Sequence, residues 1–385
     1  MMSQLDETIE AGMAHAGLPG VVALVGSRDG VIYEKAFGAR GSDDAAPMTP
    51  DTEFSLFSLT KAVTSVAAMQ LVEQGQLNLD ADIGAILPWL ANPRVVTGYD
   101  DAGEPLTRPA VRPITLRHLL THTAGFGYEF MSLEMLRSRG PGGAPPSTSK
   151  AWLKGSLLFD PGDRWEYGRS TDLVGQAVEA VSGVDLAGYF GKHIFGPLGM
   201  TRTGFFPDQS RLASMHARTP DGGVTQIPSM VALLAGGEFL SGGGGLVGTG
   251  SDYMRFLRTI LNGGELDGAR VLRAETVAEM SRNQIGDLRA GQLGSVVESM
   301  IVPFDLFPDM RPGWGLGFLI NPQPVPGGRA AGSLAWAGLA NTHFWIDPVS
   351  DRAGLVLTQL FPFGDQRLMQ LLASFERAVY GMQAS

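Results

Sequence analysis

The chain has 385 residues, of which 44% are hydrophobic and 18% charged, a composition typical of a soluble globular protein with one or two domains. Its net charge of −10 argues against nucleic acids and anionic membrane surfaces as partners, and the absence of cysteine excludes disulfides, thiolate metal sites and cysteine nucleophiles. No apolar run has the length of a membrane span, and no signal peptide is visible at the N-terminus, so we expect a cytoplasmic protein.

The first elements are expected to be a helix and a hairpin. Residues 3–17 have apolar side chains at helical spacing and predict an amphipathic helix. Residues 20–27 and 31–38 are apolar and flank Asp29-Gly30, a turn sequence that indicates two paired strands.

The next stretch, Phe54–Ser65, reads F-S-L-F-S-L-T-K-A-V-T-S and opens an apolar run of helical period that ends near Gly75. Ser58 and Lys61 stand three residues apart, so a helix brings the hydroxyl and the amine to one face. At a helix start, unpaired N–H groups and the helix dipole favour a developing negative charge. A serine needs a base to become a nucleophile, and a lysine can act as that base when burial lowers its pKa. Ser58 and Lys61 are therefore a candidate nucleophile and base.

A histidine pair follows an excursion of the chain. Residues 91–113 predict an exposed excursion with a small hairpin, and Thr115 is the expected N-cap of a short helix that stops at Gly125. His118 and His122 are four residues apart, a spacing that occurs in zinc sites. The zincin pattern needs a glutamate directly after the first histidine, and here a leucine follows it, so we interpret the pair as structural and expect no metal.

Two other serines have the local pattern of a nucleophile. Ser147 precedes Lys150 by three residues, but its Gly- and Pro-rich surroundings favour a role as the cap of a short helix. Ser170 lies in Gly168-Arg-Ser-Thr-Asp172, which is close to the G-x-S-x-G pattern of α/β-hydrolases. The final glycine is an aspartate, no clear strand precedes the motif, and the chain lacks βαβ alternation, so we disfavour Ser170.

The last part of the chain returns to strands. The glycine cluster at residues 235–250 lacks the G-K-[ST] of a phosphate loop and precedes a helix that Ser251 is expected to cap. Residues 284–311 form a long connection of the kind found in pocket walls or lids, with an ordered surface loop as an equal alternative. Four strands are expected at residues 315–320, 332–337, 342–346 and 353–360, and an amphipathic helix at 365–380. Both ends of the chain therefore contribute to one sheet domain, and a helical domain is inserted between them.

Three separated motifs combine into a family resemblance. They are Ser58-Leu-Thr-Lys61, Tyr167 within W-E-Y-G-R-S-T-D, and Trp336-Ala-Gly338 followed by N-T-H-F-W-I-D-P. Their order and spacing resemble the serine β-lactamase and penicillin-binding-protein superfamily in its class C-like branch, nearest to the family VIII carboxylesterases, with the lovastatin-type acyltransferases and aminohexanoate-dimer hydrolases close by. Supporting stretches are ITLRHLLTHTAG (114–125), PGDRWEYG (161–168), GGGGL (242–246), WGLGF (314–318) and LTQLFPF (357–363).

The resemblance implies the fold. It would be an α/β sandwich of the β-lactamase/transpeptidase type, in which N- and C-terminal helices flank an antiparallel sheet. Residues 1–55 and 240–385 would form the sheet domain, and residues 56–239 the inserted, mostly helical domain. The active site would lie at the interface of the two domains.

The resemblance also implies an acyl-enzyme mechanism. Ser58 would attack a carbonyl carbon, while Lys61 and Tyr167 would share its proton and later activate water. Lys61 and Tyr167 would titrate as a unit in which the ammonium favours the phenolate. The backbone N–H groups of Ser58 and Leu339 would form the oxyanion hole. Taken alone, Tyr167 and Trp336 are more readily interpreted as ordinary buried aromatic residues.

The same resemblance suggests which residues contact the substrate. Trp336, Ala337 and Gly338 would line one side of the pocket. Tyr128, Phe130, Met131 and parts of residues 296–310 are further candidates for an apolar pocket wall.

Two departures from the family pattern bear on the substrate. The third residue of the family's Y-x-N motif is Arg169 here, so an asparagine that would bond the lysine and a substrate amide is missing, and we expect Arg169 to point to solvent. The K-T-G motif of β-lactamases is replaced by Trp336-Ala-Gly, because Lys192 is the only lysine after Tyr167. The usual cation for a β-lactam carboxylate is thus missing from that strand, which favours neutral esters.

We therefore expect a serine carboxylesterase that cleaves short- or medium-chain esters through an acyl-enzyme on Ser58, with a small-molecule ester as its partner and without a cofactor. An acyltransferase is the nearest alternative, because water and an alcohol compete for the same acyl-enzyme, and a β-lactamase or amidase comes next. A catalytically weak scaffold on the same fold also stays open. Arg169 and Ala337 favour the scaffold mildly, whereas the joint presence of Ser58, Lys61 and Tyr167 opposes it.

Overall fold

The two ends of the chain form one sheet. The computed structural model describes residues 2–43 and 46–382 and contains a seven-stranded sheet in the order β13-β14-β15-β16-β17-β1-β2, with every neighbouring pair antiparallel. The first two strands are the hairpin predicted around Asp29-Gly30. The strands of this sheet are β1 (Gly20–Gly26), β2 (Val31–Gly38), β13 (Gly313–Trp314), β14 (Leu319–Ile320), β15 (Leu334–Gly338), β16 (Thr342–Asp347) and β17 (Arg352–Leu357).

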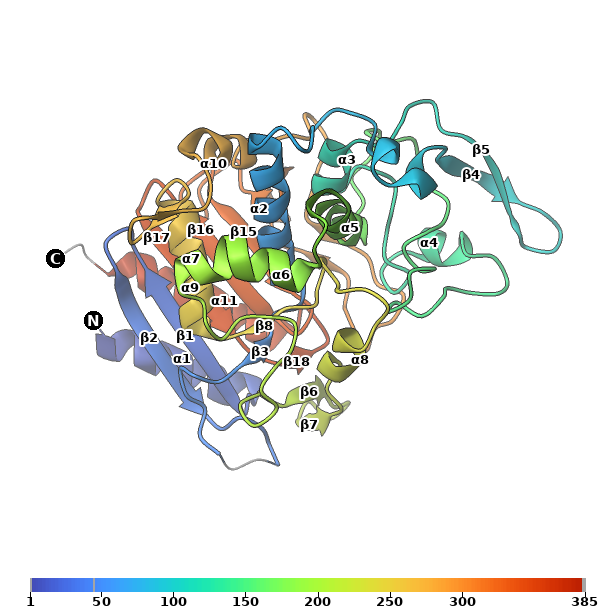
Figure 1. Ribbon diagram of the computed structural model, residues 1–385. Helices are drawn as coiled ribbons and strands as arrows, with labels where there is room; N and C mark the ends of the chain where they lie inside the picture. The colour runs from blue at the N-terminus through green and yellow to red at the C-terminus, as the bar shows by residue number, and fades with distance from the viewer. Residues whose placement is uncertain (1, 44–45, 383–385) are drawn as a thin grey trace.

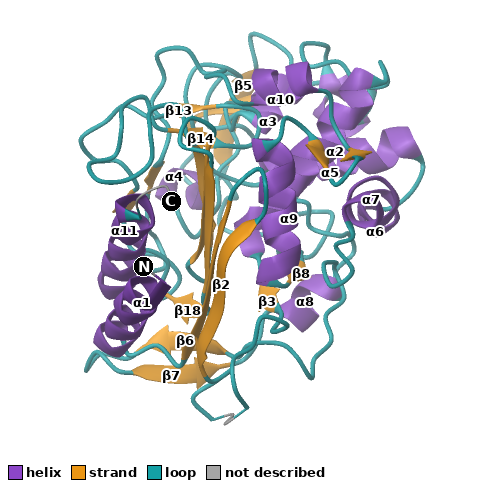
Figure 2. Cartoon of the chain, turned by 90° about the vertical axis from the view of Figure 1, so that its left-hand side faces the viewer, coloured by secondary structure: helices purple, strands orange, loops and turns teal. Residues whose placement is uncertain are grey.

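Helices cover both faces of the sheet (Figure 2). On one face, α1 (Met2–Ala16) and α11 (Gln366–Gly381) pack against each other, and their buried side chains form one apolar cluster with residues of β1 and β16. On the other face, α9 (Gly250–Leu261) lies against β1, β16 and β17. The predicted helix-flanked antiparallel sandwich is therefore confirmed.

A buried helix connects the sheet to the remainder of the molecule. α2 (Thr60–Glu73) follows directly on a 3-10 turn, η1 (Phe57–Leu59), which packs on β15. Helix α2 itself packs on α5 (Ser170–Ser182) and α6 (Leu186–Phe190). Every residue of α2 as far as Leu71 is buried, which explains why its apolar residues surround the whole helix instead of forming a stripe. The segment with Ser58 and Lys61 thus lies between the sheet and the inserted helices.

The other elements surround this frame, and the inserted part is not purely helical. It includes the predicted hairpin, which projects from the body as β4 and β5 (Figure 1), and the strands β6 and β7, which form a small sheet with β18 from the C-terminal part of the chain. The domain boundaries at residues 55/56 and 239/240 stay a prediction. The remaining helical elements are η2 (Ile83–Ala85), η3 (Pro88–Leu90), α3 (Leu116–Leu120), α4 (Leu133–Arg137), η4 (Gly191–Phe195), α7 (Gly196–Leu198), α8 (Val231–Ala235) and α10 (Ala274–Met280). The remaining strands are β3 (Phe54–Ser55), β4 (Arg94–Tyr99), β5 (Pro105–Pro109), β6 (Met215–Arg218), β7 (Val224–Ile227), β8 (Val247–Gly248), β9 (Glu265–Leu266), β10 (Ala269–Arg270), β11 (Gln292–Leu293), β12 (Phe304–Asp305) and β18 (Leu360–Phe361).

Two predicted caps are wrong. Helix α9 is capped by Thr249, whose side chain accepts the N–H of Asp252, whereas the hydroxyl of Ser251 bonds Glu34. Ser147 caps no helix, because residues 146–152 form turns. The local sequence did not show which of two nearby hydroxyl residues, Thr249 or Ser251, caps α9. It also did not distinguish the turns around Ser147 from a short helix.

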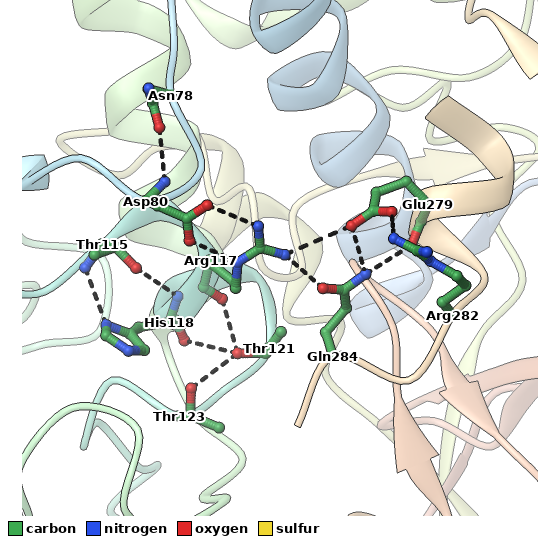
Figure 3. Close-up of polar contacts among 10 residues, drawn as sticks. All are labelled: Asn78, Asp80, Thr115, Arg117, His118, Thr121, Thr123, Glu279, Arg282 and Gln284. Atoms are coloured by element: carbon green, nitrogen blue, oxygen red, sulfur yellow. Dashed lines mark hydrogen bonds and ion pairs between the residues drawn. The ribbon is translucent and has the colours of Figure 1, made fainter. Parts of the chain in front are cut away.

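Helix α3 shows how the inserted part is tied to the sheet side. Thr115 caps it as predicted, but the helix ends at Leu120, and His122 already has a left-handed φ of 57°. Arg117 on this helix donates to both carboxylate oxygens of Asp80 at 2.7 and 2.8 Å and also to Gln284, which lies just beyond α10 (Figure 3). These charge-assisted bonds hold α3 in place and thereby position the start of the loop that follows it.

Candidate active site

A cavity of about 390 Å³ lies where η1, β15 and the start of α5 meet. It has a polar base that includes Ser58, Tyr167 and Ser241, and a largely apolar wall. The wall combines the predicted pocket residues with parts of the 284–311 connection and of α8. Its lining residues include Tyr128, Phe130, Met131, Met230, Leu234, Leu293, Met300, Phe304, Leu306, Trp336, Ala337, Gly338 and Leu339. The long connection is thus a pocket wall.

Ser58 and Lys61 are in contact at the base of this cavity. The Nζ atom of Lys61 lies 3.1 Å from Ser58 Oγ. Phe57, directly before the serine, has a φ of 46°, a backbone conformation that costs a non-glycine residue about 1 kcal/mol or more. This turn leads the chain from β3 into η1 and leaves Ser58 at the cavity.

Lys61 is fully enclosed and has three polar partners. Besides Ser58 Oγ, its Nζ donates to the hydroxyl of Tyr128 at 3.0 Å and to the carbonyl oxygen of Gly243 at 2.7 Å. Burial lowers the pKa of Lys61 to about 7, and the negative charge of Asp172 acts in the opposite direction. Near neutral pH, a large fraction of Lys61 is therefore an uncharged amine that can accept the proton of Ser58.

Tyr167 lies close to the same serine. Its hydroxyl accepts a hydrogen bond from Trp336 Nε1 at 2.9 Å and is also hydrogen-bonded to the Ser58 side chain. The amine of Lys61 faces the ring of Tyr167, 4.8 Å from its centroid, and not its hydroxyl. Burial raises the pKa of Tyr167, and the two hydrogen bonds oppose this only in part. The predicted ammonium–phenolate pair is therefore not favoured, because burial shifts both groups towards their neutral forms.

Tyr128 has a contact that sequence reasoning missed. It was predicted only as a pocket wall, yet its hydroxyl bonds Lys61. Tyr128 thus bonds the lysine in place of the asparagine that is missing from the Y-x-N motif. Its ring is stacked between Trp152, at a centroid distance of 6.0 Å, and Phe130, at 5.2 Å. No local pattern around Tyr128 indicates this contact, which depends on the meeting of two distant segments.

Arg169 is buried, so the prediction that it points to solvent is wrong. Its guanidinium lies over the rings of Phe126 and Trp152, at 4.8 and 5.7 Å, and its Nη1 is 3.4 Å from Glu129 Oε1. Arg169 occupies the N-cap position of α5 without a capping bond from its side chain, which extends towards the segment that carries Tyr128. The aromatic rings and the carboxylate offset part of the cost of enclosing the charge.

Asp172 and the glycine cluster complete the base of the cavity. The Oδ1 atom of Asp172 accepts bonds from Ser241 Oγ at 2.6 Å and from the N–H of Gly243 at 3.0 Å. A side chain at Gly243 would overlap this carboxylate, so the loop needs glycine there. From the sequence, Asp172 was considered only as the residue that breaks the G-x-S-x-G pattern, and the glycine cluster only as a loop. Neither residue type indicates by itself that the two segments contact each other.

Leu339 directly follows β15 and lines the cavity together with Ser58. A Cβ atom at Gly338 would overlap both Thr342 Oγ1 and the Leu56 carbonyl oxygen, so only glycine lets the end of β15 approach η1 this closely. The predicted oxyanion donors, the N–H groups of Ser58 and Leu339, therefore come from two segments packed against each other.

The other candidates lie apart from this centre or have structural contacts. His118 Nδ1 accepts the N–H of Thr115, and His122 packs against the ring of Tyr167 at 4.8 Å, so the two histidines do not form a pair. Ser170 begins α5, and its buried hydroxyl has no hydrogen-bond partner. Ser147 lines the cavity, and Lys150 bonds Glu238 through its backbone. Within residues 2–43 and 46–382, no three His, Asp or Glu side chains are grouped as metal ligands.

Comparison with known proteins identifies the family. A family model described as Beta-lactamase matches residues 5–376. The chain belongs to the beta-lactamase family. The lovastatin esterase of Penicillium rubens is 32% identical to this family member, over 98% of this chain and 98% of its own. The monacolin J acid methylbutanoyltransferase of Aspergillus terreus is 32% identical, over 94% of this chain and 92% of its own. The unliganded structure of simvastatin synthase (LovD) from Aspergillus terreus is 29% identical, with a TM-score of 0.83 over 99% of this chain and 98% of its own.

These findings confirm the resemblance to the serine β-lactamases and penicillin-binding proteins and the corresponding fold. Because the named relatives are an esterase and acyltransferases, this beta-lactamase family member is an enzyme of the serine hydrolase and acyltransferase class. None of the helices in the described part of the chain has the length and hydropathy needed to cross a bilayer.

Proposed function

We propose that this protein is a serine carboxylesterase that cleaves neutral short- and medium-chain esters through an acyl-enzyme on Ser58. The observation that carries the proposal is the 3.1 Å contact between Ser58 Oγ and the enclosed amine of Lys61, whose pKa burial lowers to about 7. A nucleophile, a base of suitable pKa and an apolar cavity meet at this one point.

The proposed mechanism has two halves. Ser58 Oγ attacks the ester carbonyl carbon while Lys61 accepts its proton, and the N–H groups of Ser58 and Leu339 stabilise the negative oxygen. The tetrahedral intermediate collapses, the C–O bond to the alcohol breaks, and the ammonium of Lys61 returns the proton to the leaving alkoxide, to which the Tyr167 hydroxyl donates a hydrogen bond. Water then gives a proton to Lys61 and attacks the acyl group, and Ser58 leaves with a proton as the acid is released.

The charges that line the cavity support a neutral substrate. The acidic residues that line the cavity are Glu129 and Asp172, and no lysine or arginine is among the described residues that line it, because the amine of Lys61 is enclosed and not exposed to the cavity. A substrate carboxylate, as in a β-lactam, would therefore meet no positive partner at the surface of the cavity. This argues for a neutral ester and against a penicillin or a D-Ala-D-Ala peptide.

An acyltransferase is the second candidate, and the acyltransferases among the relatives support it. The methylbutanoyltransferase of Aspergillus terreus resembles this chain as closely as the lovastatin esterase does. In a transferase, an alcohol would replace water in the second half, and the same Ser58, Lys61 and Tyr167 would act on it. Apolar walls around the serine suit either acceptor.

The test is hydrolysis of p-nitrophenyl butyrate by the wild type, by Ser58→Ala and by the matched control Ser170→Ala, with a chromogenic cephalosporin in parallel. We expect a burst of p-nitrophenol and steady turnover by the wild type and by Ser170→Ala, and loss of both in Ser58→Ala. If added alcohols are converted to butyrate esters in place of the release of free butyrate, the enzyme transfers the acyl group. Unchanged turnover by Ser58→Ala would refute the nucleophile, and a wild type without burst or turnover would support the scaffold alternative.

A further inference from the structure

The amine of Lys61 acts as a base only when its lone pair faces Ser58. An uncharged amine has two N–H groups and one lone pair, whereas the ammonium has three donors. The Nζ atom lies 2.7 Å from the Gly243 carbonyl oxygen, 3.0 Å from the Tyr128 hydroxyl and 3.1 Å from Ser58 Oγ. Because a carbonyl oxygen can only accept, one N–H points at Gly243. When the Tyr128 oxygen accepts the other, the lone pair is left for the proton of Ser58.

The shortest of these three contacts is made by a residue in a run of four glycines. Residues 241–246, the glycine loop, read S-G-G-G-G-L, and glycine has more backbone freedom than any other residue. Such a segment keeps a carbonyl oxygen directed at an amine only if contacts with the rest of the protein hold it. The orientation of Lys61 therefore depends on what holds this loop.

Helix α2 bonds the loop on either side of Gly243. Thr64 Oγ1 donates to the Gly242 carbonyl oxygen at 2.7 Å, and the N–H of Leu246 donates to Thr60 Oγ1 at 3.1 Å. These bonds place the loop along the helix that carries Lys61. They do not involve the N–H of Gly243 itself, which is bonded from a different helix.

Asp172 on α5 is the partner of that N–H. Its Oδ1 atom accepts the N–H of Gly243 at 3.0 Å and the hydroxyl of Ser241 at 2.6 Å, and its side chain is buried. Gly243 thus donates to Asp172 and accepts from Lys61. Burial raises the pKa of Asp172, while the charge of Lys61 and the two bonds lower it. An aspartate oxygen accepts hydrogen bonds in both the ionised and the protonated form, so this contact does not require the charge.

The loop also touches both helices closely. A Cβ atom at Gly242 would lie 3.1 Å from the Thr171 carbonyl oxygen of α5 and 3.1 Å from Thr64 Cγ2 of α2. A Cβ atom at Gly243 would lie 2.4 Å from Asp172 Oδ2. With so little free space between the carboxylate and the loop, a displaced carboxylate would displace Gly243 as well.

We propose that Asp172 is a positioning residue for the catalytic base. By holding the N–H of Gly243 it directs the Gly243 carbonyl oxygen at Lys61, and so turns the lone pair of the amine towards Ser58. The inference rests on the proposed function, in which Lys61 is the base. Asp172 acts through the geometry of the loop and not through its charge.

Two substitutions separate geometry from charge. Asp172→Asn keeps an acceptor oxygen in place and removes the charge, whereas Asp172→Glu keeps the charge and moves the carboxylate by one methylene. The assay is kcat/KM for p-nitrophenyl butyrate at pH 9, where Lys61, with its pKa of about 7, is uncharged. We expect Asp172→Asn to stay within about threefold of the wild type and Asp172→Glu to fall by about ten- to a hundredfold, because a displacement of about 1 Å can have that effect.

Asp252 offers a matched control. It is buried near the start of α9, and its Oδ2 atom likewise accepts one backbone N–H, from Arg202 at 2.7 Å, and one hydroxyl, from Thr203 at 3.0 Å. It is not among the described residues that line the cavity. Asp252→Asn and Asp252→Glu should lower the melting temperature and leave kcat/KM unchanged.

Crystal structures of the wild type and of Asp172→Glu give a readout that needs no turnover. We expect the Gly243 carbonyl oxygen within hydrogen-bond distance of Lys61 Nζ in the wild type, and beyond about 3.5 Å from it in Asp172→Glu. If Asp172→Glu does not fold, Asp172→Ser, which withdraws the acceptor from the loop, takes its place with the same two expectations.

Four results would overturn the inference. They are a carbonyl oxygen still bonded to Lys61 in Asp172→Glu, an unchanged kcat/KM in that variant, a loss of about tenfold or more in Asp172→Asn, and an equal loss in Asp252→Glu. Turnover that persists in Ser58→Ala would instead reject the proposed function. The crystal structures would then still show whether Asp172 places the Gly243 carbonyl.

Discussion

The hydroxyl of Tyr128 offers a sharp test of how the base is held. In Tyr128→Phe the ring keeps its stacks with Trp152 and Phe130, and only the 3.0 Å bond to Lys61 is lost. Lys61 is enclosed, so no water replaces the acceptor, and an unsatisfied buried donor costs about 1–3 kcal/mol. If the free energy of the transition state rises by that amount relative to the free enzyme and substrate, kcat/KM for p-nitrophenyl butyrate falls by about 5- to 150-fold. Loss of an acceptor also disfavours the ammonium, so the acid limb should move to lower pH.

Tyr189→Phe is the matched control, because the Tyr189 hydroxyl is buried but has no hydrogen-bond partner. It removes the same atom from a similar environment and should leave kcat/KM and its pH profile unchanged. The melting temperature of both variants, measured by circular dichroism, should stay within a few degrees of the wild type. A Tyr128→Phe enzyme with wild-type kcat/KM, or an equal loss in Tyr189→Phe, would refute the reasoning.

Three further outcomes follow from the same contacts. Because the uncharged amine of Lys61 is the active form and its pKa is about 7, kcat/KM of the wild type should rise with pH through about 7 and level off above it, and a profile that is flat from pH 5 to 9 would contradict this. Gly338→Ala should abolish turnover and lower the urea midpoint, since its Cβ would overlap Thr342 and the Leu56 carbonyl, whereas Gly98→Ala meets nothing within 4 Å and serves as the control. Glu376→Gln leaves Arg329 as an uncompensated buried charge and should reduce the free energy of unfolding by about 3 kcal/mol, as measured in urea, while kcat/KM is retained.

The features that sequence could predict are those set by short patterns. The hairpin around Asp29-Gly30, the helix after Ser58 and the strands at both ends each depend on periodicity or turn chemistry within about ten residues. The contact of Ser58 with Lys61 follows from their spacing alone, because a helical turn brings residues three apart together.

The features that sequence missed depend on which segments meet in space. Arg169 was expected at the surface because arginine usually is, and its burial follows from two rings and a carboxylate supplied by residues 126–152. The Tyr128–Lys61 bond likewise joins segments 67 residues apart. Residues 315–320 were predicted as one strand, but Gly317 has a φ of 103° and separates two short strands. These outcomes belong to tertiary packing, which periodicity does not encode.

The construction of the cavity has a consequence for how new specificities can arise in this fold. Its base is fixed by η1, α2 and β15, whereas its apolar wall comes from the loop after α3, the region of α8 and the 291–306 connection. Lengthening a connection costs little chain entropy, since the loop-closure term grows only with the logarithm of its length. Wall segments can therefore be exchanged or resized without disturbing the serine and its base. Directed evolution of this enzyme towards bulkier acyl groups should accordingly begin with libraries at Met131, Met230 and Met300, where flexible thioether side chains already accommodate irregular shapes.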